Sequence, residues 1–294
     1  MRDTPAGPAL AEAPPYRPTD PRALTPRWHE PDRHEAAIVV HVLGWPQDVA
    51  RALGSLARHS AGVDYQVLLV ADGAGEATGR ALEEIARADP VPGRVQVLHL
   101  DPPIGFGAAM NLAMSQATGR VLVWLDPHVE ATGDLLRPLL DALADPTVAV
   151  AGGWGVVTRS MLEFHAADGP EVDAIEGYLL AVPRALAARA EVDPKARYYR
   201  NADLGYSFAL RDLGQPSGRP LRAVRVPLPA RRHTHRAWHE TPQTERDRSS
   251  KKNYDRFLAR WRQRTDLLTK GSAATTGTTS GTSRARNLGG SPSV

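Results

Sequence analysis

Cysteine is absent from this chain of 294 residues, and its absence removes several kinds of protein from consideration. Without cysteine there is no disulfide framework, no metal site built on thiolates and no cysteine nucleophile. Long apolar runs are also missing, because no stretch approaches the roughly 20 residues that a membrane-spanning helix requires. The first residues lack the basic and then apolar pattern of a secretory signal. We therefore expect a cytoplasmic protein without an integral membrane segment.

The composition divides the chain into three parts. Residues 1–35 are rich in proline and charge and show no apolar periodicity, which predicts a disordered or loosely wrapped arm. Residues 271–294 are mostly small or polar and cannot bury a core, which predicts a disordered tail. Residues 36–270 hold the remaining apolar sequence and are long enough for one domain with a substantial core.

Positive charge is concentrated toward the C-terminus. Residues 219–270 contain fifteen Lys or Arg and five Asp or Glu, whereas the net charge of the whole chain is only +3. This balance indicates a phosphate-bearing partner, whether a nucleotide diphosphate, an anionic membrane surface or nucleic acid, or else a solvated helical face. Phe257 and Trp261 stand four residues apart, which is more typical of a core-facing stripe than of a base-stacking platform. We therefore expect no nucleic-acid partner and leave peripheral membrane contact open.

Predicted strands and helices alternate along the central part. Short apolar runs rich in β-branched residues predict buried strands at 36–45, 65–75, 93–101 and 120–126. Apolar periodicity predicts helices at 46–60, 105–119 and 132–146. Gly119 would stop the second helix, and Pro138 is tolerable only in the first turn of the third. This order predicts an α/β fold with a mostly parallel central sheet flanked by helices.

Acidic residues stand at the ends of three predicted strands. They are Asp72, Asp101 and Asp126, and the last is followed by Pro127 and His128. In open parallel sheets, ligands bind beyond the carboxyl ends of the strands. A buried strand that ends on a carboxylate and an imidazole therefore predicts a binding site at residues 126–128.

The order of motifs resembles glycosyltransferase family 2, the nucleotide-diphospho-sugar transferases with a single Rossmann-like domain called GT-A. The resemblance covers roughly residues 36–265 and rests on seven pieces in one order, none of them specific alone. They are VVHVLGWPQDVARALGSL, LLVADGAG, IGFGAAMNLAMSQATG, VLVWLDPH, IEGYLLAVPR, YYRNADLGYSFALRDLG and RRHTHRAWHE. The resemblance implies a nucleotide-diphospho-sugar donor and a glycan or small-molecule acceptor.

Four further residues are assigned to the donor on this resemblance. Asp72 would contact the base and ribose, since a carboxylate accepts from N–H and hydroxyl groups, although a carboxylate that stabilises a glycine turn fits the same pattern. Gly105 and Asn111 lie in the stretch that the family places near the nucleotide, and Asn111 fits a satisfied core amide equally well. Arg232 suits the diphosphate through its fork of donors.

The tripeptide at 126–128 matches the family's Asp-x-Asp motif, with His128 in place of the second aspartate. With Asp126 it would hold a divalent cation against the donor phosphates and offset the charge of the leaving diphosphate. Mg²⁺ and Mn²⁺ both suit oxygen ligands, and an imidazole shifts the preference toward Mn²⁺. His233 and His235 are candidates for a third ligand, since alternation puts both on one side of an extended segment. The alternative is a His128 that faces substrate without binding metal.

The chain departs from the family at the catalytic base. Inverting members carry Glu-Asp-x-Asp where this chain has RNAD at residues 200–203, and an aspartate of that first pair removes the acceptor proton. Asn201 cannot act as a base at neutral pH. Asp203, Glu176 or Asp173 would therefore take that role, or the protein does not catalyse the inverting reaction.

Two hypotheses for function remain in front. The leading one is a glycosyltransferase that moves a sugar from a nucleotide diphosphate to an acceptor hydroxyl, inverting and metal-assisted. The alternative is a degenerate GT-A protein that binds a sugar nucleotide or a glycan without turnover. A basic module for nucleic acid or anionic membranes rests on charge alone and ranks third.

Overall fold

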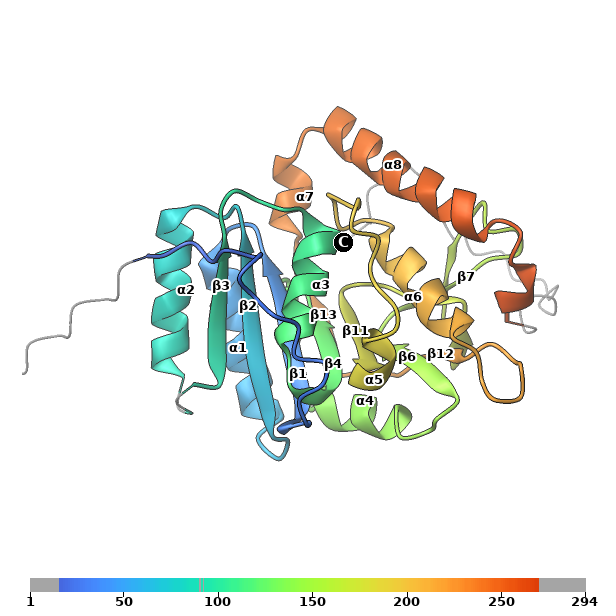
Figure 1. Cartoon of the computed structure of the whole chain (residues 1–294), viewed down its shortest axis with the longest axis horizontal. Helices are drawn as coiled ribbons and strands as arrows, with labels where there is room; N and C mark the ends of the chain where they lie inside the picture. The colour runs from blue at the N-terminus through green and yellow to red at the C-terminus, as the bar shows by residue number, and fades with distance from the viewer. Residues whose placement is uncertain (1–15, 90, 92, 270–294) are drawn as a thin grey trace, which may run out of the picture.

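A mixed eight-stranded sheet runs through the centre of the molecule (Figure 1). The computed structural model describes residues 16–89, 91 and 93–269, so the predicted tail and the first fifteen residues of the predicted arm lie outside the described residues. The strand order is β3-β2-β1-β4-β11-β6-β12-β9. The bounds are β1 His34–Val42, β2 Tyr65–Asp72, β3 Val95–Leu100, β4 Gly119–Leu125, β6 Val148–Gly152, β9 Glu171–Val172, β11 Leu179–Pro183 and β12 Arg222–Arg225.

The N-terminal half of the sheet is parallel. β1 pairs parallel with both β2 and β4, and β3 joins the other side of β2 in the same direction. β11 runs antiparallel between β4 and β6, and β12 continues parallel to β6. The prediction of a mostly parallel central sheet flanked by helices is therefore confirmed, and the polar ends of β2, β3 and β4 meet at one edge.

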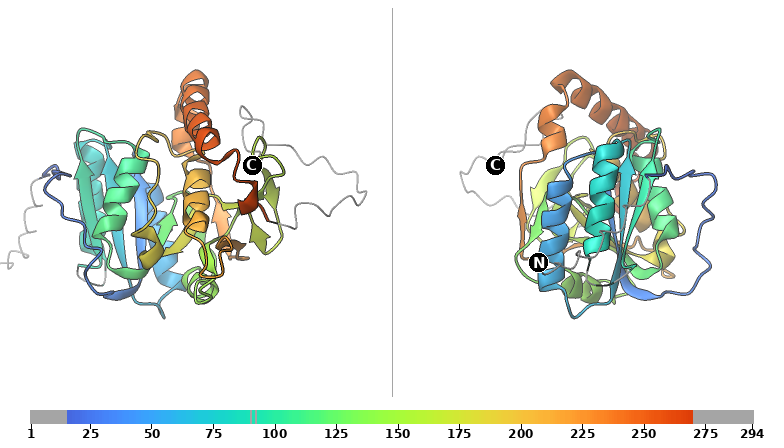
Figure 2. Two further views of the ribbon diagram at one scale, coloured as in Figure 1. Left: turned by 45° about the vertical axis from the view of Figure 1, so that its right-hand side comes forward. Right: turned by 90° about the vertical axis from the view of Figure 1, so that its left-hand side faces the viewer.

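Helices cover both faces of the sheet, which explains why its strands are apolar on both sides (Figures 1 and 2). Within β1, Ile38 and Val40 belong to one buried cluster and Ala37 and Val39 to the other. The first cluster includes residues of α1 (Pro46–His59), α2 (Glu76–Ala88) and α4 (Leu136–Ala142). The second includes residues of α3 (Phe106–Gln116), α5 (Arg184–Ala187) and α6 (Ala202–Asp212).

A third cluster joins the C-terminal helix to the body. The helices α7 (Arg236–Glu240) and α8 (Gln243–Trp261) precede the short helix η1 (Thr265–Leu267). Phe257 and Trp261 of α8 pack against Phe208 of α6, so the predicted core-facing stripe is confirmed. A small sheet of β7 (Gly155–Val157), β8 (His165–Ala167) and β10 (Ala174–Ile175) lies in the same region. Every helix in the described part of the chain is too short or too polar to cross a bilayer.

Two local expectations need correction. The helix expected at 105–119 ends at Gln116, and Gly119 is the first residue of β4. A Cβ on Gly119 would lie 2.3 Å from the backbone of Ala36, so this glycine permits the close approach of β1 and does not stop a helix. The helix α2 is an element that the apolar pattern did not predict. Pro138 does lie in the first turn of α4, as expected.

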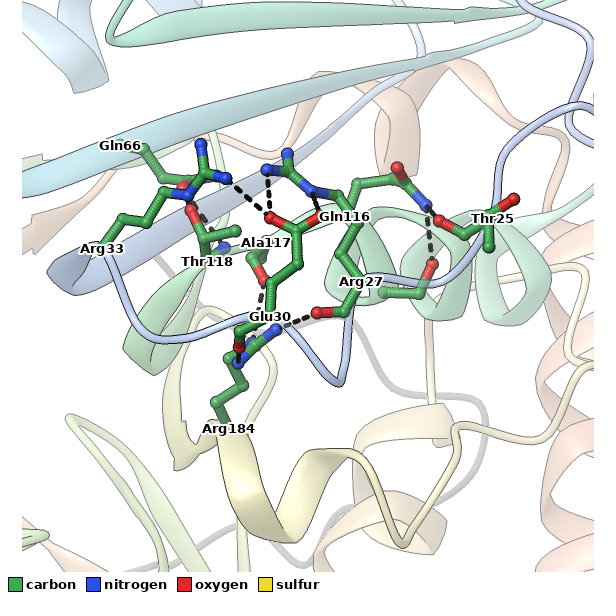
Figure 3. A network of polar contacts seen from close by, with 10 residues as sticks. Thr25, Arg27, Glu30, Arg33, Gln66, Gln116, Ala117, Thr118 and Arg184 are labelled. Carbon is green, nitrogen blue, oxygen red and sulfur yellow. Dashed lines mark hydrogen bonds and ion pairs between the residues drawn. The ribbon is translucent and has the colours of Figure 1, made fainter.

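Polar contacts fix residues 16–33 on the surface of the domain (Figure 3). Arg184, which is 6% exposed, donates through Nε to the carbonyl of Ala117 at 2.9 Å and through Nη1 to that of Glu30 at 2.9 Å. Its Nη2 donates to the carbonyl of Arg27. These contacts favour the wrapped alternative for the described part of the arm, while the division into arm, domain and tail stays a prediction.

We expect Arg184→Met to lower the free energy of unfolding by about 3 kcal/mol, because several partly buried carbonyls lose their donor together. Urea denaturation of the full chain measures this loss. The exposed Arg189 on the next turn is a matched control, and Arg189→Met should cost less than about 0.5 kcal/mol. Equal effects of the two substitutions would show that Arg184 contributes nothing through these contacts.

Candidate functional site

A two-stranded sheet brings two distant segments of the chain together. β5 (Val129–Ala131) pairs antiparallel with β13 (Ala230–Arg232). The N–H of His233 then donates to the carbonyl of His128 at 2.7 Å, which extends the pairing by one step. The residues that follow β13 therefore lie over the end of β4, although they stand about a hundred positions later in the sequence.

Three side chains converge beyond the end of β4. Nδ1 of His128 lies 2.7 Å from Oδ1 of Asp126, and Nε2 of His235 lies 3.3 Å from Oδ2 of the same carboxylate. The two imidazole rings are stacked with their centroids 4.3 Å apart. One potential ligand atom from each of the three residues lies within 4.8 Å of the others. A carboxylate with two imidazoles is a donor set suited to first-row divalent cations such as Mn²⁺.

The electrostatics of this trio favour a charged carboxylate. Burial alone would raise the pKa of Asp126, but the neighbouring imidazoles of His235 and His128 outweigh burial and hold it well below its ordinary value. The backbone of Asp126 is fixed as well, since its N–H donates to the carbonyl of Tyr178 at 2.9 Å. Asp126 thus presents a positioned negative charge at neutral pH.

Asp48 of α1 supports the trio from behind. This carboxylate is 1% exposed, and its Oδ2 lies 2.9 Å from Nε of Arg236 and 3.6 Å from Nε2 of His128. The N–H of Arg236 also donates to Nε2 of His128 at 3.2 Å. The His128 ring is therefore held at both nitrogens, which fixes its orientation. Sequence reasoning missed Asp48, because an acidic residue in the first turn of a helix is already explained by the helix dipole.

The structure separates the two histidines proposed as the third ligand. His235 caps α7, where its Nδ1 accepts from the N–H of Trp238 at 3.1 Å, and its ring stacks on Tyr199 with centroids 4.7 Å apart. His233 lies outside the trio, because its Nε2 is 2.7 Å from Oε2 of Glu130. The extended segment assumed in the alternation argument ends with β13, and the chain then turns into a helix.

Asp72 occupies the end of β2 with both oxygens already bonded. Oδ1 accepts from the N–H of Ile104 at 2.7 Å, and Oδ2 accepts from the N–H of Gly105 at 3.0 Å. Gly105 has a φ of +92°, and a Cβ there would lie 3.1 Å from the Cα of Arg197. These contacts are those of a carboxylate that fixes a glycine turn, the second of the two interpretations given for Asp72.

The remaining predicted donor residues differ in where they lie. Both polar atoms of the Asn111 amide are bonded to the backbone of Val192, at 2.8 Å and 2.9 Å, as in the core-amide interpretation. The guanidinium of Arg232 lies 4.9 Å from the rings of both Trp154 and Tyr178. Tyr178 also supplies the carbonyl that binds the backbone of Asp126, so the structure brings Arg232 to the side of the trio.

Asp203 lies in the first turn of α6, on the other side of Tyr178. Its Oδ2 accepts from the N–H of Gly177 at 2.8 Å and its Oδ1 from that of Leu204 at 3.0 Å. Burial raises the pKa of Asp203 above its ordinary value despite these bonds. The pKa of Tyr178 is raised by burial and then by the charges of Asp126 and Asp203, among others, so both carboxylates lie close to this ring.

The other two acidic candidates for the base lie differently. Glu176 immediately precedes Gly177 and is 5% exposed, with its N–H bonded to the carbonyl of Trp154. Asp173 is fully buried, and its oxygens accept from the N–H groups of Thr158 and Thr269 at 2.7 Å each. The expectation that Asp173 could reach an acceptor is therefore wrong.

Comparison with known families decides the kinship of the chain. The sequence profile of the family described as "Glycosyl transferase family 2" matches residues 37–204 of the 294. The chain belongs to glycosyl transferase family 2. The resemblance inferred from its motifs is thereby confirmed, and the matched segment runs from β1 into α6 and includes Asp72, Asp126 and Asp203.

Curated relatives match only short stretches of this family 2 chain. "Polypeptide N-acetylgalactosaminyltransferase 5" of Caenorhabditis elegans is 34% identical over 89 residues, which are 30% of this chain and 14% of the relative. "Putative inactive polypeptide N-acetylgalactosaminyltransferase 12" of Drosophila melanogaster is 40% identical over 58 residues, which are 20% of this chain and 10% of the relative. The chain therefore spans no more than about a seventh of these relatives' length.

Solved structures share the GT-A fold with this chain. A crystal structure of GalNAc-T7 with UDP, GalNAc and Mn²⁺ superposes with a TM-score of 0.62 at 16% identity, covering 77% of this chain and 48% of that one. The mannosyltransferase PcManGT from Pyrobaculum calidifontis, in complex with GDP-Man and Mn²⁺, gives 0.54 at 18% identity, covering 79% and 69%. At these identities the likeness concerns the fold alone.

Asp72→Asn should lower the free energy of unfolding at pH 7 by about 2 kcal/mol, because an amide oxygen serves only one of the two N–H groups. Burial would raise the pKa of Asp72, but bonds from His41 and from these N–H groups hold it below its ordinary value. The contribution of Asp72 is therefore fully present above its unfolded pKa of about 4 and is lost as the pH falls through the lowered folded pKa.

The difference between wild type and Asp72→Asn should accordingly shrink as urea denaturation is repeated from pH 7 down to about pH 3. Asp141→Asn, at an exposed position of α4, is the charge-matched control. A difference that grows on acidification would contradict the assignment.

Proposed function

We propose that this family 2 protein transfers a sugar from a nucleotide-diphosphate donor to the hydroxyl of a glycan or small-molecule acceptor, with a divalent cation held by Asp126, His128 and His235. The observation that carries the proposal is the convergence of these three side chains at the carboxyl end of β4. This edge is where an open α/β sheet binds its ligand. Two proteins of the same fold were solved with Mn²⁺ and with UDP or GDP-Man, which supports the same ligand classes here.

The donor set fits Mn²⁺ better than Mg²⁺, because two of its three members are imidazoles. A cation bound there would offset the negative charge that builds on the leaving diphosphate. Asp48 and the backbone of Arg236 orient His128, and the stack of His235 on Tyr199 orients the second imidazole. Arg232 adds a positive charge on the same side, where its fork of donors suits a phosphate.

Asp203 is the residue best placed to act as the base. Each of its oxygens accepts one backbone N–H and keeps a further lone pair for an acceptor hydroxyl. As the acceptor oxygen forms its bond to the anomeric carbon, its proton passes to Asp203, and the bond to the diphosphate breaks with the electron pair leaving on the diphosphate oxygen. Such a one-step displacement inverts the anomeric configuration, which NMR of the product would show.

Binding without transfer is the second candidate, and one observation favours it. Asn201, at the position where inverting members carry an acid, donates its amide to the carbonyl of Ser250 at 3.2 Å and has a left-handed φ of 66°. Its role is therefore structural, and catalysis depends entirely on Asp203 or on Glu176. A curated relative whose name includes the word "inactive" is consistent with loss of turnover in this group.

His235→Ala should weaken the binding of UDP in the presence of Mn²⁺ by roughly tenfold or more, because the cation loses one of three ligands. His233→Ala, only two positions away, should change this affinity by less than about twofold, since His233 bonds to Glu130. Isothermal titration calorimetry with and without Mn²⁺ measures both. Equal losses in the two variants, or an effect of His235→Ala that persists without metal, would contradict the metal assignment.

Asp203→Asn should lower the rate of sugar transfer by roughly 10²- to 10⁴-fold, as expected for the loss of a general base, while UDP affinity with Mn²⁺ stays unchanged. The wild-type rate should rise with pH through a pKa above the ordinary value of about 4, because burial raises the pKa of Asp203 and only the carboxylate accepts the proton.

Transfer from UDP-N-acetylgalactosamine and from GDP-mannose onto a panel of sugars provides the assay, with Glu176→Gln as the companion variant. A full loss in Glu176→Gln with little change in Asp203→Asn would move the base to Glu176. Tight UDP binding without transfer from either donor would favour the binding protein.

A further inference from the structure

Two arginines lie side by side on the acceptor flank without an acidic partner. The guanidinium of Arg200 lies 4.5 Å from the ring of Trp238, and that of Arg246 lies 4.3 Å from it. Within residues 16–269 as far as they are described, neither guanidinium forms an ion pair or a hydrogen bond. An aromatic face stabilises cations of this kind, but it does not neutralise them.

Buried hydrogen-bond donors gather at the same place. Nε1 of Trp238, Nε of Arg246 and Oγ of Ser250 are all buried, and none has a partner among the described residues. Arg246 and Ser250 are four positions apart on α8 and therefore share one face of that helix. Because buried polar groups are nearly always paired, three unpaired donors in one locality indicate a place that receives an acceptor.

This locality adjoins the candidate base. Arg200 stands three residues before Asp203, and its positive charge acts on both Asp203 and Tyr178. The bond from Asn201 to the carbonyl of Ser250 fixes the loop that carries Arg200 onto α8. Arg200 and Asn201 also line a hollow of about 330 Å³, whose lining includes one acid, Glu163. A ligand group bound by the two arginines would therefore lie on the acceptor side.

We propose that Arg200 and Arg246 bind an anionic group, a phosphate or a carboxylate, on the acceptor molecule. The inference rests on the proposed function and deepens it, since it makes the acceptor an anionic sugar or alcohol. A guanidinium fork matches the oxygens of either group. The negative charge would also relieve the repulsion between the two neighbouring guanidiniums, and it would place the acceptor hydroxyl within reach of Asp203.

The test is a calorimetric titration of the full chain with glucose 6-phosphate, glucuronate and glucose, in the presence of saturating UDP and Mn²⁺. We expect at least one anionic sugar to bind roughly tenfold more tightly than glucose, and Arg200→Gln and Arg246→Gln each to remove that advantage. Arg260→Gln is the matched control, because Arg260 is also an arginine of α8 over an indole, 4.5 Å from the ring of Trp261. It should keep wild-type binding.

The two anionic probes distinguish the sources of the charge, since phosphate and carboxylate are tested separately. The proposal is overturned if neither binds better than glucose, or if both arginine variants bind them as the wild type does. A loss of UDP affinity of about tenfold in Arg200→Gln would place this arginine at the donor diphosphate and also overturn it. Failure of the proposed function would show differently, as a wild type that does not bind UDP, and the anion titration without nucleotide would then stand alone.

Discussion

The pairing of β5 with β13 is the contact on which the candidate site depends. It is a short ladder, extended by the bond from His233 to the carbonyl of His128. Through it the chain after residue 230 crosses the end of β4, so that His235 meets Asp126 and Arg236 meets Asp48. Without this ladder the sheet would keep its acidic strand ends, but the carboxylate of Asp126 would have one imidazole beside it and not two.

The sheet itself could be predicted from the sequence, because its strands are short apolar runs buried on both faces. The order of β1 to β4 and the placement of Asp126 at a strand end follow from that pattern alone. The helix α2 escaped notice because it follows a glycine-rich turn and carries many charges. Gly119 was misplaced because a glycine after a helix and a glycine under a crossing backbone have the same sequence signature.

The site was less predictable than the fold, for a physical reason that Asp72 and Asp126 illustrate together. Both are acidic residues at the ends of parallel strands, and nothing in the local sequence separates them. Asp72 is saturated by two backbone N–H groups of its own turn, whereas Asp126 faces two imidazoles. The difference lies in partners that are far away in the chain. Asn111 shows the same limit, since its partner Val192 stands 81 positions later.

The five residues of α7 have a consequence for the order of events at the site. His235 caps this single turn, and Trp238, which carries the two guanidiniums, lies within it. A shift of the turn would displace a ligand of the trio and the floor of the arginine pair at once. Occupancy on one side is therefore thermodynamically linked to occupancy on the other, and by reciprocity each ligand would alter the affinity of the other by the same factor. One turn of helix is enough to make a two-substrate protein sense both substrates.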